Sequence, residues 1–268
     1  MYRQILLPVQ EASEVEPLMR FAAMLLDADG ELRVLHVIPT TTLPQVTRAW
    51  RASVNLVVPA HEAGAALDVR VEPEVRAATD VPGEILESAE AHDVDAIALT
   101  LGGDRRSHNP FVGHTASGIL QHAHCDVIVL NRLALAADRF PRILVPAYET
   151  PPAPRVMRVA EELSVRNQGI PVITLSLGAR TSAGDRADVE ERSPRGIAIT
   201  HKHSFFPAAT LGRRRRLPEV IVEAAARERY GLLLVGEETD RVASPLLTRR
   251  FLEELFRAAP CPVLALRV

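Results

Sequence analysis

The sequence predicts an α/β protein built from two tandem domains, each with a parallel sheet covered by helices on both faces. Short apolar runs of strand length alternate with segments whose apolar residues recur at helical spacing. A chain of 268 residues with 47% hydrophobic residues can fill two such cores. Residues of the first half also recur in the second at a nearly constant offset, as in Ile5, Pro8 and Cys125 against Ile143, Pro146 and Cys261. These observations indicate a tandem duplication.

The first half begins with alternating strands and helices. The predicted elements, in order, are a strand over 5–9, an amphipathic helix over 11–26, a strand over 32–38, a helix over 43–65, an edge strand over 67–71 and a helix from 79 to about 92. Asp29-Gly30 is expected to end the first helix, and Pro59 to kink or interrupt the second. Asp80 and Pro82 provide a cap and an early proline for the third helix.

The stretch from Val94 to Leu130 completes this half as strand, loop, helix and strand. An apolar run ends at Leu99, a polar loop follows, Gly113 opens a segment with helical spacing, and a second apolar run covers 127–130. The loop between a strand end and a helix start can bind anions, because the first backbone N–H groups of the helix are unpaired and the dipole is positive there.

The second half repeats this layout. A strand at Ile143–Ala147, a helix opened by Pro218 and a closing strand, loop, helix and strand over 230–266 match the first half. The polar segment 178–195 is predicted to be a mobile loop in place of a helix. We therefore expect domains at 1–132 and 141–268, joined by a linker at 133–140.

Composition and charge exclude several classes of function. A net charge of −3 gives no electrostatic reason to expect nucleic-acid binding. No apolar run approaches the roughly 20 residues that a membrane-spanning helix needs. The chain starts directly with a strand and shows no signal peptide, and its two cysteines sit at equivalent positions and are not expected to form a disulfide. A cytoplasmic location is predicted.

Four segments together resemble the universal stress protein family. They are I-L-L-P-V at 5–9, L-H-V-I at 35–38, the glycine loop, and H-C-D-V-I-V-L at 124–130. The resemblance covers both halves and implies two five-stranded, Rossmann-like parallel sheets of strand order 3-2-1-4-5, related by a pseudo-twofold and able to pair through the last strand. It also implies an ATP site with the pattern Gly-x2-Gly-x9-Gly-(Ser/Thr), an Asp after the first strand and backbone groups after the second.

The first half carries part of this pattern. Gln10 stands where the family has Asp, Thr100 replaces the first motif glycine, and His114 replaces the Ser/Thr, with Thr115 following. The candidate nucleotide-binding residues are thus Gln10, Val37, Gly103, Gly113, His114 and Thr115. If the site binds ATP or another anion, the phosphates are expected against backbone N–H groups near the two glycines. Protonated His114 would add a charge-assisted bond, so that binding strengthens as the pH falls.

The second half carries less of the pattern, and no nucleotide is expected there. Tyr148 stands at the position of the family Asp, and Leu175 stands at the position that Val37 occupies in the first half. Gly236 keeps the first glycine, but the other motif positions hold Thr239, Arg249 and Arg250, whose side chains obstruct close approach of a phosphate to the backbone. The two arginines are expected to face solvent or to pair with Glu253 and Glu254 at helical spacing, with an anion contact as the alternative.

Other clusters do not assemble into a site by spacing. The cluster of Cys125 with the histidines at 108, 114, 122 and 124 lacks a recognised zinc spacing, so no metal site is predicted. The run Arg213–Arg216 is interpreted as a solvated loop, with contact to an acidic partner, nucleic acid or membrane surface as the alternative. Ser117 has no glycine elbow, and no nucleophile, base and orienting residue can be combined. Enzymatic activity is therefore not supported.

The sequence is best interpreted as a tandem regulatory or stress-response module that binds a nucleotide or another anion weakly in its first domain. One alternative is a ligand-free interaction module that regulates a partner, such as a membrane transporter. The other is a slow ATP hydrolase. Partners could therefore be a small-molecule nucleotide, another protein or a second copy of the chain. The identity of the ligand, partner and stress signal stays open.

Overall fold

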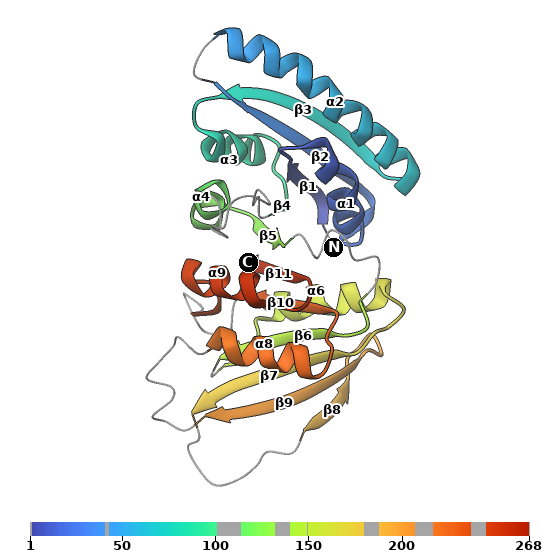
Figure 1. Ribbon diagram of the computed structural model, residues 1–268. Helices are drawn as coiled ribbons and strands as arrows, with labels where there is room; N and C mark the ends of the chain where they lie inside the picture. The colour runs from blue at the N-terminus through green and yellow to red at the C-terminus, as the bar shows by residue number, and fades with distance from the viewer. Residues whose placement is uncertain are drawn as a thin grey trace. The chain divides into compact units, whose positions relative to one another are not determined.

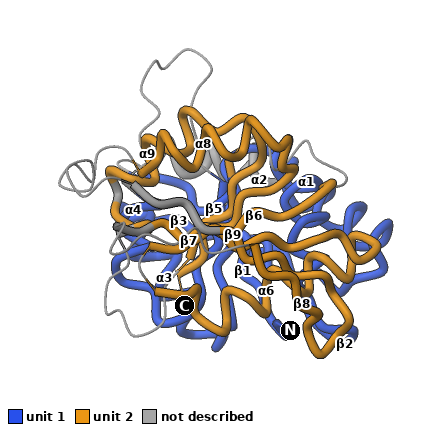
Figure 2. The backbone as a smooth tube through the Cα atoms, turned by 90° about the horizontal axis from the view of Figure 1, so that it is seen from below, with its two compact units in different colours: residues 1–104, 112–130 blue, residues 105–111, 131–268 orange. Residues whose placement is uncertain are grey.

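The chain folds into two compact units. A computed structural model describes residues 2–40, 43–100, 114–131, 140–148, 150–179, 188–206, 217–236 and 245–267. Among these, residues up to 130 form unit 1 and residues from 131 onward form unit 2 (Figure 2). The predicted linker over 133–140 falls mostly outside the described residues, so the domain boundaries and the pseudo-twofold stay predictions.

Unit 1 alternates strands and helices along the chain (Figure 1). Its elements are β1 (Tyr2–Pro8), α1 (Ala12–Ala23), β2 (Leu26–Pro39), α2 (Leu43–Leu67), β3 (Arg70–Ala78), α3 (Val81–Ala91), β4 (Ala96–Thr100), α4 (His114–His122) and β5 (Asp126–Leu130). All neighbouring strands pair in parallel, in the predicted order β3-β2-β1-β4-β5. Helices α1 and α2 pack together, as do α3 and α4, because each parallel connection crosses a face of the sheet.

The strand order places a topological switch point between β1 and β4. From β1 the chain proceeds outward to β2 and β3, and then crosses to β4 and β5 on the other side. The central strands are buried in their middle, with Ile5 and Leu6 on β1 and Ile97 on β4 fully buried. In open α/β sheets, ligands bind outside the carboxyl ends of the strands at such a point.

Several boundaries in unit 1 differ from the prediction. Helix α1 ends at Ala23, and Gly30 lies inside β2 instead of ending the helix. A Cβ at Gly30 would lie 2.5 Å from Leu26 Cγ, and the pairing of β1 with β2 shifts register here, so this glycine allows an irregular strand. Helix α2 runs unbroken through Pro59 to Leu67, and the expected edge strand over 67–71 starts only at Arg70. Asp68, with φ of 55°, separates the two elements.

Unit 2 repeats the pattern with one addition. Its elements are β6 (Ile143–Tyr148), α6 (Pro154–Arg166), β7 (Val172–Ala179), β8 (Val189–Arg192), β9 (Ala198–Phe206), α8 (Leu217–Arg227), β10 (Leu232–Gly236), the 3-10 turn η2 (Pro245–Leu247), α9 (Arg249–Ala258) and β11 (Val263–Arg267). The order is β11-β10-β6-β7-β9-β8, with β6 in the predicted central place. This is the order of unit 1 with β8 added at the edge.

The additional strand corrects the prediction of a purely parallel, five-stranded second sheet and of a loop over 178–195. Strand β8 pairs antiparallel with β9. Gly196, with φ of 78°, lies in the tight turn between them, where the Ser193 backbone N–H donates to the Ile197 carbonyl oxygen. His201 on β9 adds a side-chain contact to Glu191 of β8, with Nε2 and Oε1 3.0 Å apart. All four β8 residues are exposed, so no burial pattern marks the strand in the sequence.

A buried hydrogen bond ties the two ends of the unit 1 chain together. Tyr2 on β1 donates its hydroxyl to Asp126 Oδ2 on β5 at 2.7 Å, and both residues are buried. The duplicated positions in unit 2 hold Phe140 and Pro262, which cannot form this bond. At equivalent positions, unit 1 therefore has a hydrogen-bonded polar pair and unit 2 has two apolar residues.

Candidate functional site

A pocket of about 420 Å³ lies at the carboxyl ends of β1, β2 and β4 in unit 1, beside the switch point. Its lining comes from these strands, from the loop after β1 and from helices α1, α3 and α4. The lining residues are Pro8, Val9, Gln10, Glu14, Leu35, His36, Val37, Pro39, Val81, Ile85, Leu99, Thr100, Thr115, Ala116 and Ile119. Apolar side chains predominate and a few polar groups converge, which is typical of small-molecule sites.

One wall of the pocket is apolar. Leu35 and Val37 on β2 point to the same face of the sheet, because side chains two residues apart in a strand do so. They line the pocket together with Val81 and Ile85 of α3 and Ile119 of α4. This wall can contact a flat, uncharged group such as an aromatic ring.

The polar groups of the pocket centre on the Glu14 carboxylate. Glu14 lies in the first turn of α1, where its Oε2 accepts hydrogen bonds from the backbone N–H groups of Gln10 at 3.1 Å and Glu11 at 3.4 Å. These contacts satisfy donors at the helix start. Its other oxygen, Oε1, accepts a hydrogen bond from the Thr100 hydroxyl at the end of β4, at 3.0 Å. Glu14 is thus fixed from two elements that are far apart in the sequence.

His36 is the second polar group fixed at this position. Its Nδ1 lies 2.9 Å from the Val9 carbonyl oxygen. A carbonyl only accepts, so Nδ1 carries the proton of this hydrogen bond. Both His36 and Val9 line the pocket.

The structure brings three of the predicted site residues to this pocket: Gln10, Val37 and Thr115. His114 is the first residue of α4, and Gly103 and Gly113 lie outside the described residues. A role of these residues in ligand binding stays a prediction. Glu14 and His36 were not predicted, although L-H-V-I contains His36 and the Glu14 position, three residues after Glu11, is a capping-box signal.

The corresponding strand ends in unit 2 are filled differently. Tyr148 and Leu175 are both buried. A Cβ at Gly236 would lie 2.5 Å from Val156 Cγ2 of α6, so the glycine allows helix and strand to pack closely. Arg250 pairs with Glu254 at 3.1 Å, as predicted. Thr239 and the basic run Arg213–Arg216 lie outside the described residues.

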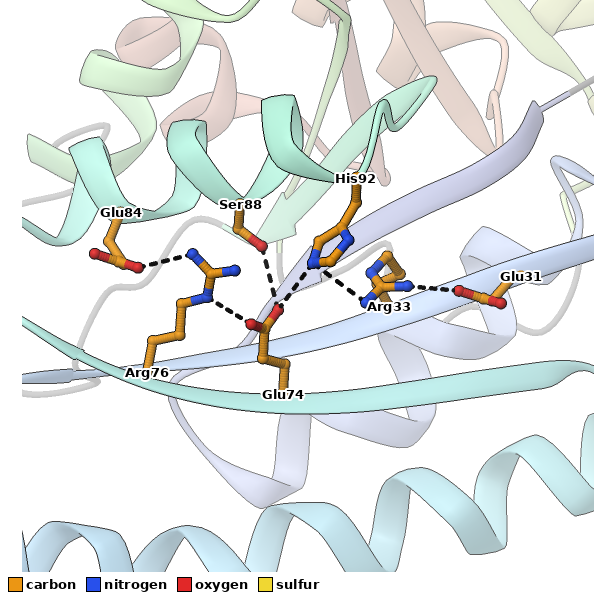
Figure 3. Close-up of polar contacts among 7 residues, drawn as sticks. All are labelled: Glu31, Arg33, Glu74, Arg76, Glu84, Ser88 and His92. Atoms are coloured by element: carbon orange, nitrogen blue, oxygen red, sulfur yellow. Dashed lines mark hydrogen bonds and ion pairs between the residues drawn. The ribbon is translucent and has the colours of Figure 1, made fainter.

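A half-buried polar network fixes helix α3 to the sheet (Figure 3). Arg76 on β3 donates to Glu74 at 2.5 Å and to Glu84 of α3 at 2.9 Å. Burial alone would lower the pKa of the Arg76 guanidinium, but the hydrogen bonds to Glu74 and Glu84 raise it above its usual value. His92, at the end of α3, lies 3.3 Å from Arg33 of β2 and 3.6 Å from Glu74. The remaining members are Glu31 and Ser88, which contact Arg33 and Glu74.

The cysteine thiols are poor nucleophiles. Cys125 and Cys261 are both free. Burial raises the pKa of each thiol to about 11, and the nearby Asp126 carboxylate adds to the effect at Cys125. In the described part of the chain, no three His, Cys, Asp or Glu side chains are grouped so as to hold a metal ion.

Residues 1–131 match the model of the universal stress protein family. This half of the chain belongs to the universal stress protein family. The resemblance inferred from the strand residues and the glycine loop is therefore confirmed. The search of curated proteins found no match to the chain.

Solved structures extend the likeness to both units. A universal stress protein from Archaeoglobus fulgidus matches 98% of this chain and 95% of its own, with a TM-score of 0.67 and 16% identity. A functionally unknown protein, PA1789, from Pseudomonas aeruginosa matches 99% and 92%, with a TM-score of 0.61 and 12% identity. The cytoplasmic domain of a prokaryotic cation chloride cotransporter matches 99% and 95%, with a TM-score of 0.56 and 9% identity. At such identities the likeness concerns the fold.

The helices that the structure describes include none with both the length and the apolar character needed to cross a membrane.

Proposed function

We propose that the chain is a regulatory or stress-response module of the universal stress protein type, which binds a nucleotide or another anion weakly in unit 1. The observation that supports it is the pocket at the switch point, where Gln10, Val37 and Thr115 line one space. Helix α4 begins beside this space at His114. Its first N–H groups and its positive dipole end suit a phosphate, and the apolar wall suits a ring.

The weakness of the binding follows from the charges of the lining. None of the pocket-lining residues that the structure describes is Lys or Arg, and Glu14 adds a negative charge. Gln10 can hydrogen-bond a ring edge but lacks the strength of a charge-assisted bond. Anion binding therefore depends on the backbone N–H groups of the loop and of α4. We place this module in the cytoplasm, since its two cysteines are free thiols.

The test is calorimetric titration of the full chain with ATP at pH 6 and pH 8. We expect binding that strengthens toward pH 6, and loss of binding in Gly113→Val, because bulk there obstructs approach to the backbone. Ser117→Val is the matched control, since it adds bulk on the same helix at a residue that does not line the pocket. Unchanged ATP affinity in Gly113→Val would overturn the proposed site.

A second candidate is a ligand-free interaction module that regulates a partner such as a membrane transporter. The likeness in fold to the cytoplasmic domain of a cation chloride cotransporter favours it. Mass spectrometry of gently purified protein separates the two candidates. Release of a nucleotide supports the ligand-binding module. Absence of any small molecule, together with no ATP binding by calorimetry, favours the interaction module.

A further inference from the structure

Two positions at which the chain departs from the family pattern meet in the pocket. Gln10 stands where the resemblance places Asp, and Thr100 stands where it places the first motif glycine. In the structure both contact Glu14: the Gln10 backbone N–H and the Thr100 hydroxyl donate to opposite oxygens of its carboxylate. A glycine at position 100 could not hold this carboxylate. Only the Thr100 contact depends on the identity of the side chain, because the Gln10 contact is made by its backbone N–H.

The polar wall made by Glu14 and Thr100 presents hydrogen-bond acceptors. Thr100 donates its only hydroxyl proton to Glu14, so that its oxygen faces a ligand with lone pairs. The Glu14 carboxylate has about four acceptor positions, and three protein donors use three of them. A ligand that contacts this wall must therefore supply the donors.

We propose that Glu14, positioned by Thr100, selects the ring of the bound ligand, and that it selects rings whose edge carries an amino group. The inference rests on the proposed function, because it concerns the same pocket. A carboxylate accepts a stronger hydrogen bond from an amino N–H than a neutral acceptor does. The carboxylate repels a ring that presents a carbonyl oxygen in the same place, since a carboxylate and a carbonyl are both hydrogen-bond acceptors.

Glu14 also determines how the ligand is oriented. A phosphate next to this carboxylate would place like charges together, which is unfavourable in a partly enclosed pocket. The ring therefore lies at the wall of Glu14 and Thr100, and any phosphate lies toward the start of α4. Glu14 takes the place of the absent Asp from one helical turn further along the chain.

The experiment compares ATP with purine riboside triphosphate on the full chain. The two nucleotides share their phosphates and an unprotonated ring N1 and differ only in the amino group of ATP, so the ratio of their Kd values isolates the contact to that group. We expect the unmodified protein to prefer ATP by roughly tenfold or more, the effect of one charge-assisted hydrogen bond. Glu14→Gln should reduce the preference to near unity, because an amide can both donate and accept while still capping α1.

Position 100 and a control helix site complete the design. Thr100→Val should lower the preference severalfold, and Thr100→Ser should restore it, because serine keeps the hydroxyl. Glu16→Gln is the matched control, since Glu16 is an exposed carboxylate on α1 that pairs with Arg20 outside the pocket. Circular dichroism of each variant verifies the fold. Binding with a ratio unchanged by Glu14→Gln would overturn this inference alone, whereas no binding of either nucleotide by the unmodified protein would overturn the proposed function as well.

Discussion

The carboxyl ends of the central strands differ between the two units although the strand order is shared. In unit 1, Thr100 at the end of β4 reaches Glu14 of α1 through a hydrogen bond, and a pocket lies next to this pair. In unit 2 the duplicated position is Gly236 at the end of β10, and Val156 of α6 packs directly onto it. Tyr148, at the position of the exposed Gln10, is buried.

The difference shows how a duplicated fold can keep its core while the strand ends of one copy change. The buried strands β1 and β6 have nearly the same residues, but the residue at the strand end decides whether the helix meets the sheet through a polar contact or an apolar one. Such positions affect the site more than the fold, because the sheet order is determined by the buried strands.

The strongest test of this comparison exchanges the two strand-end residues. Gly236→Thr should lower the free energy of unfolding by about 3 kcal/mol, because the new side chain overlaps Val156. Urea denaturation of the full chain measures the loss. Adding Val156→Ala should recover part of it by making room. A Gly236→Thr variant as stable as the unmodified chain would show that the helix moves without cost.

A second test concerns the polar pair that only unit 1 contains. Tyr2→Phe, which introduces the residue found at Phe140, should lower the free energy of unfolding by about 1–2 kcal/mol, since the Asp126 carboxylate loses a buried donor. Asp126→Ala should cost a similar amount. The double variant should cost clearly less than the sum, because the residues are hydrogen-bonded to each other. Additive losses in urea denaturation would contradict the coupling.

The smallest expected effect is a pH dependence specific to unit 2. Burial alone would raise the pKa of the Glu228 carboxyl, but hydrogen bonds from Lys202 at 2.7 Å and Tyr230 at 2.9 Å lower it below 4.5. A lowered pKa in the folded state means that the stabilisation is present above the ordinary value and is lost as the pH falls through the lowered one. We expect a loss below about 1 kcal/mol for this half-exposed pair.

Thermal denaturation between pH 6 and pH 3 measures this effect, with Lys202→Met as the comparison. The variant should lose part of the acid sensitivity of the unmodified chain, because Glu228 then lacks its main cationic partner. Arg250→Met, which removes an exposed pair on α9, is the control. Equal acid sensitivity in all three proteins would mean that Glu228 does not contribute.

Much of the fold follows from local pattern. The apolar runs at 5–9 and 127–130 were predicted as buried strands because their side chains are apolar, and the duplication predicts the matching strands of unit 2. The edge elements were harder to predict. Gly30 was interpreted as a helix end because its close approach to the Leu26 side chain cannot be seen in the sequence. Strand β8 was missed because its residues are stabilised by backbone pairing with β9 and not by burial.

The candidate site was predictable only in part. Gln10, Val37 and Thr115 were found through the family resemblance, and the structure places them at one pocket. The contact of Thr100 with Glu14 joins residues 86 positions apart, so no local pattern could reveal it. The His36 ring is likewise held by a hydrogen bond to the Val9 carbonyl oxygen, and the two residues become neighbours only when β1 and β2 pair.

The network on helix α3 has a consequence for the thermodynamics of binding. Val81 and Ile85 form part of the apolar wall, while Glu84 and His92 on the same helix are held to β2 and β3. A wall fixed in this way does not have to be ordered by the ligand, so little conformational entropy is lost when a ring enters. Ligands would then be distinguished by enthalpy, from hydrogen bonds with side chains that are already in place.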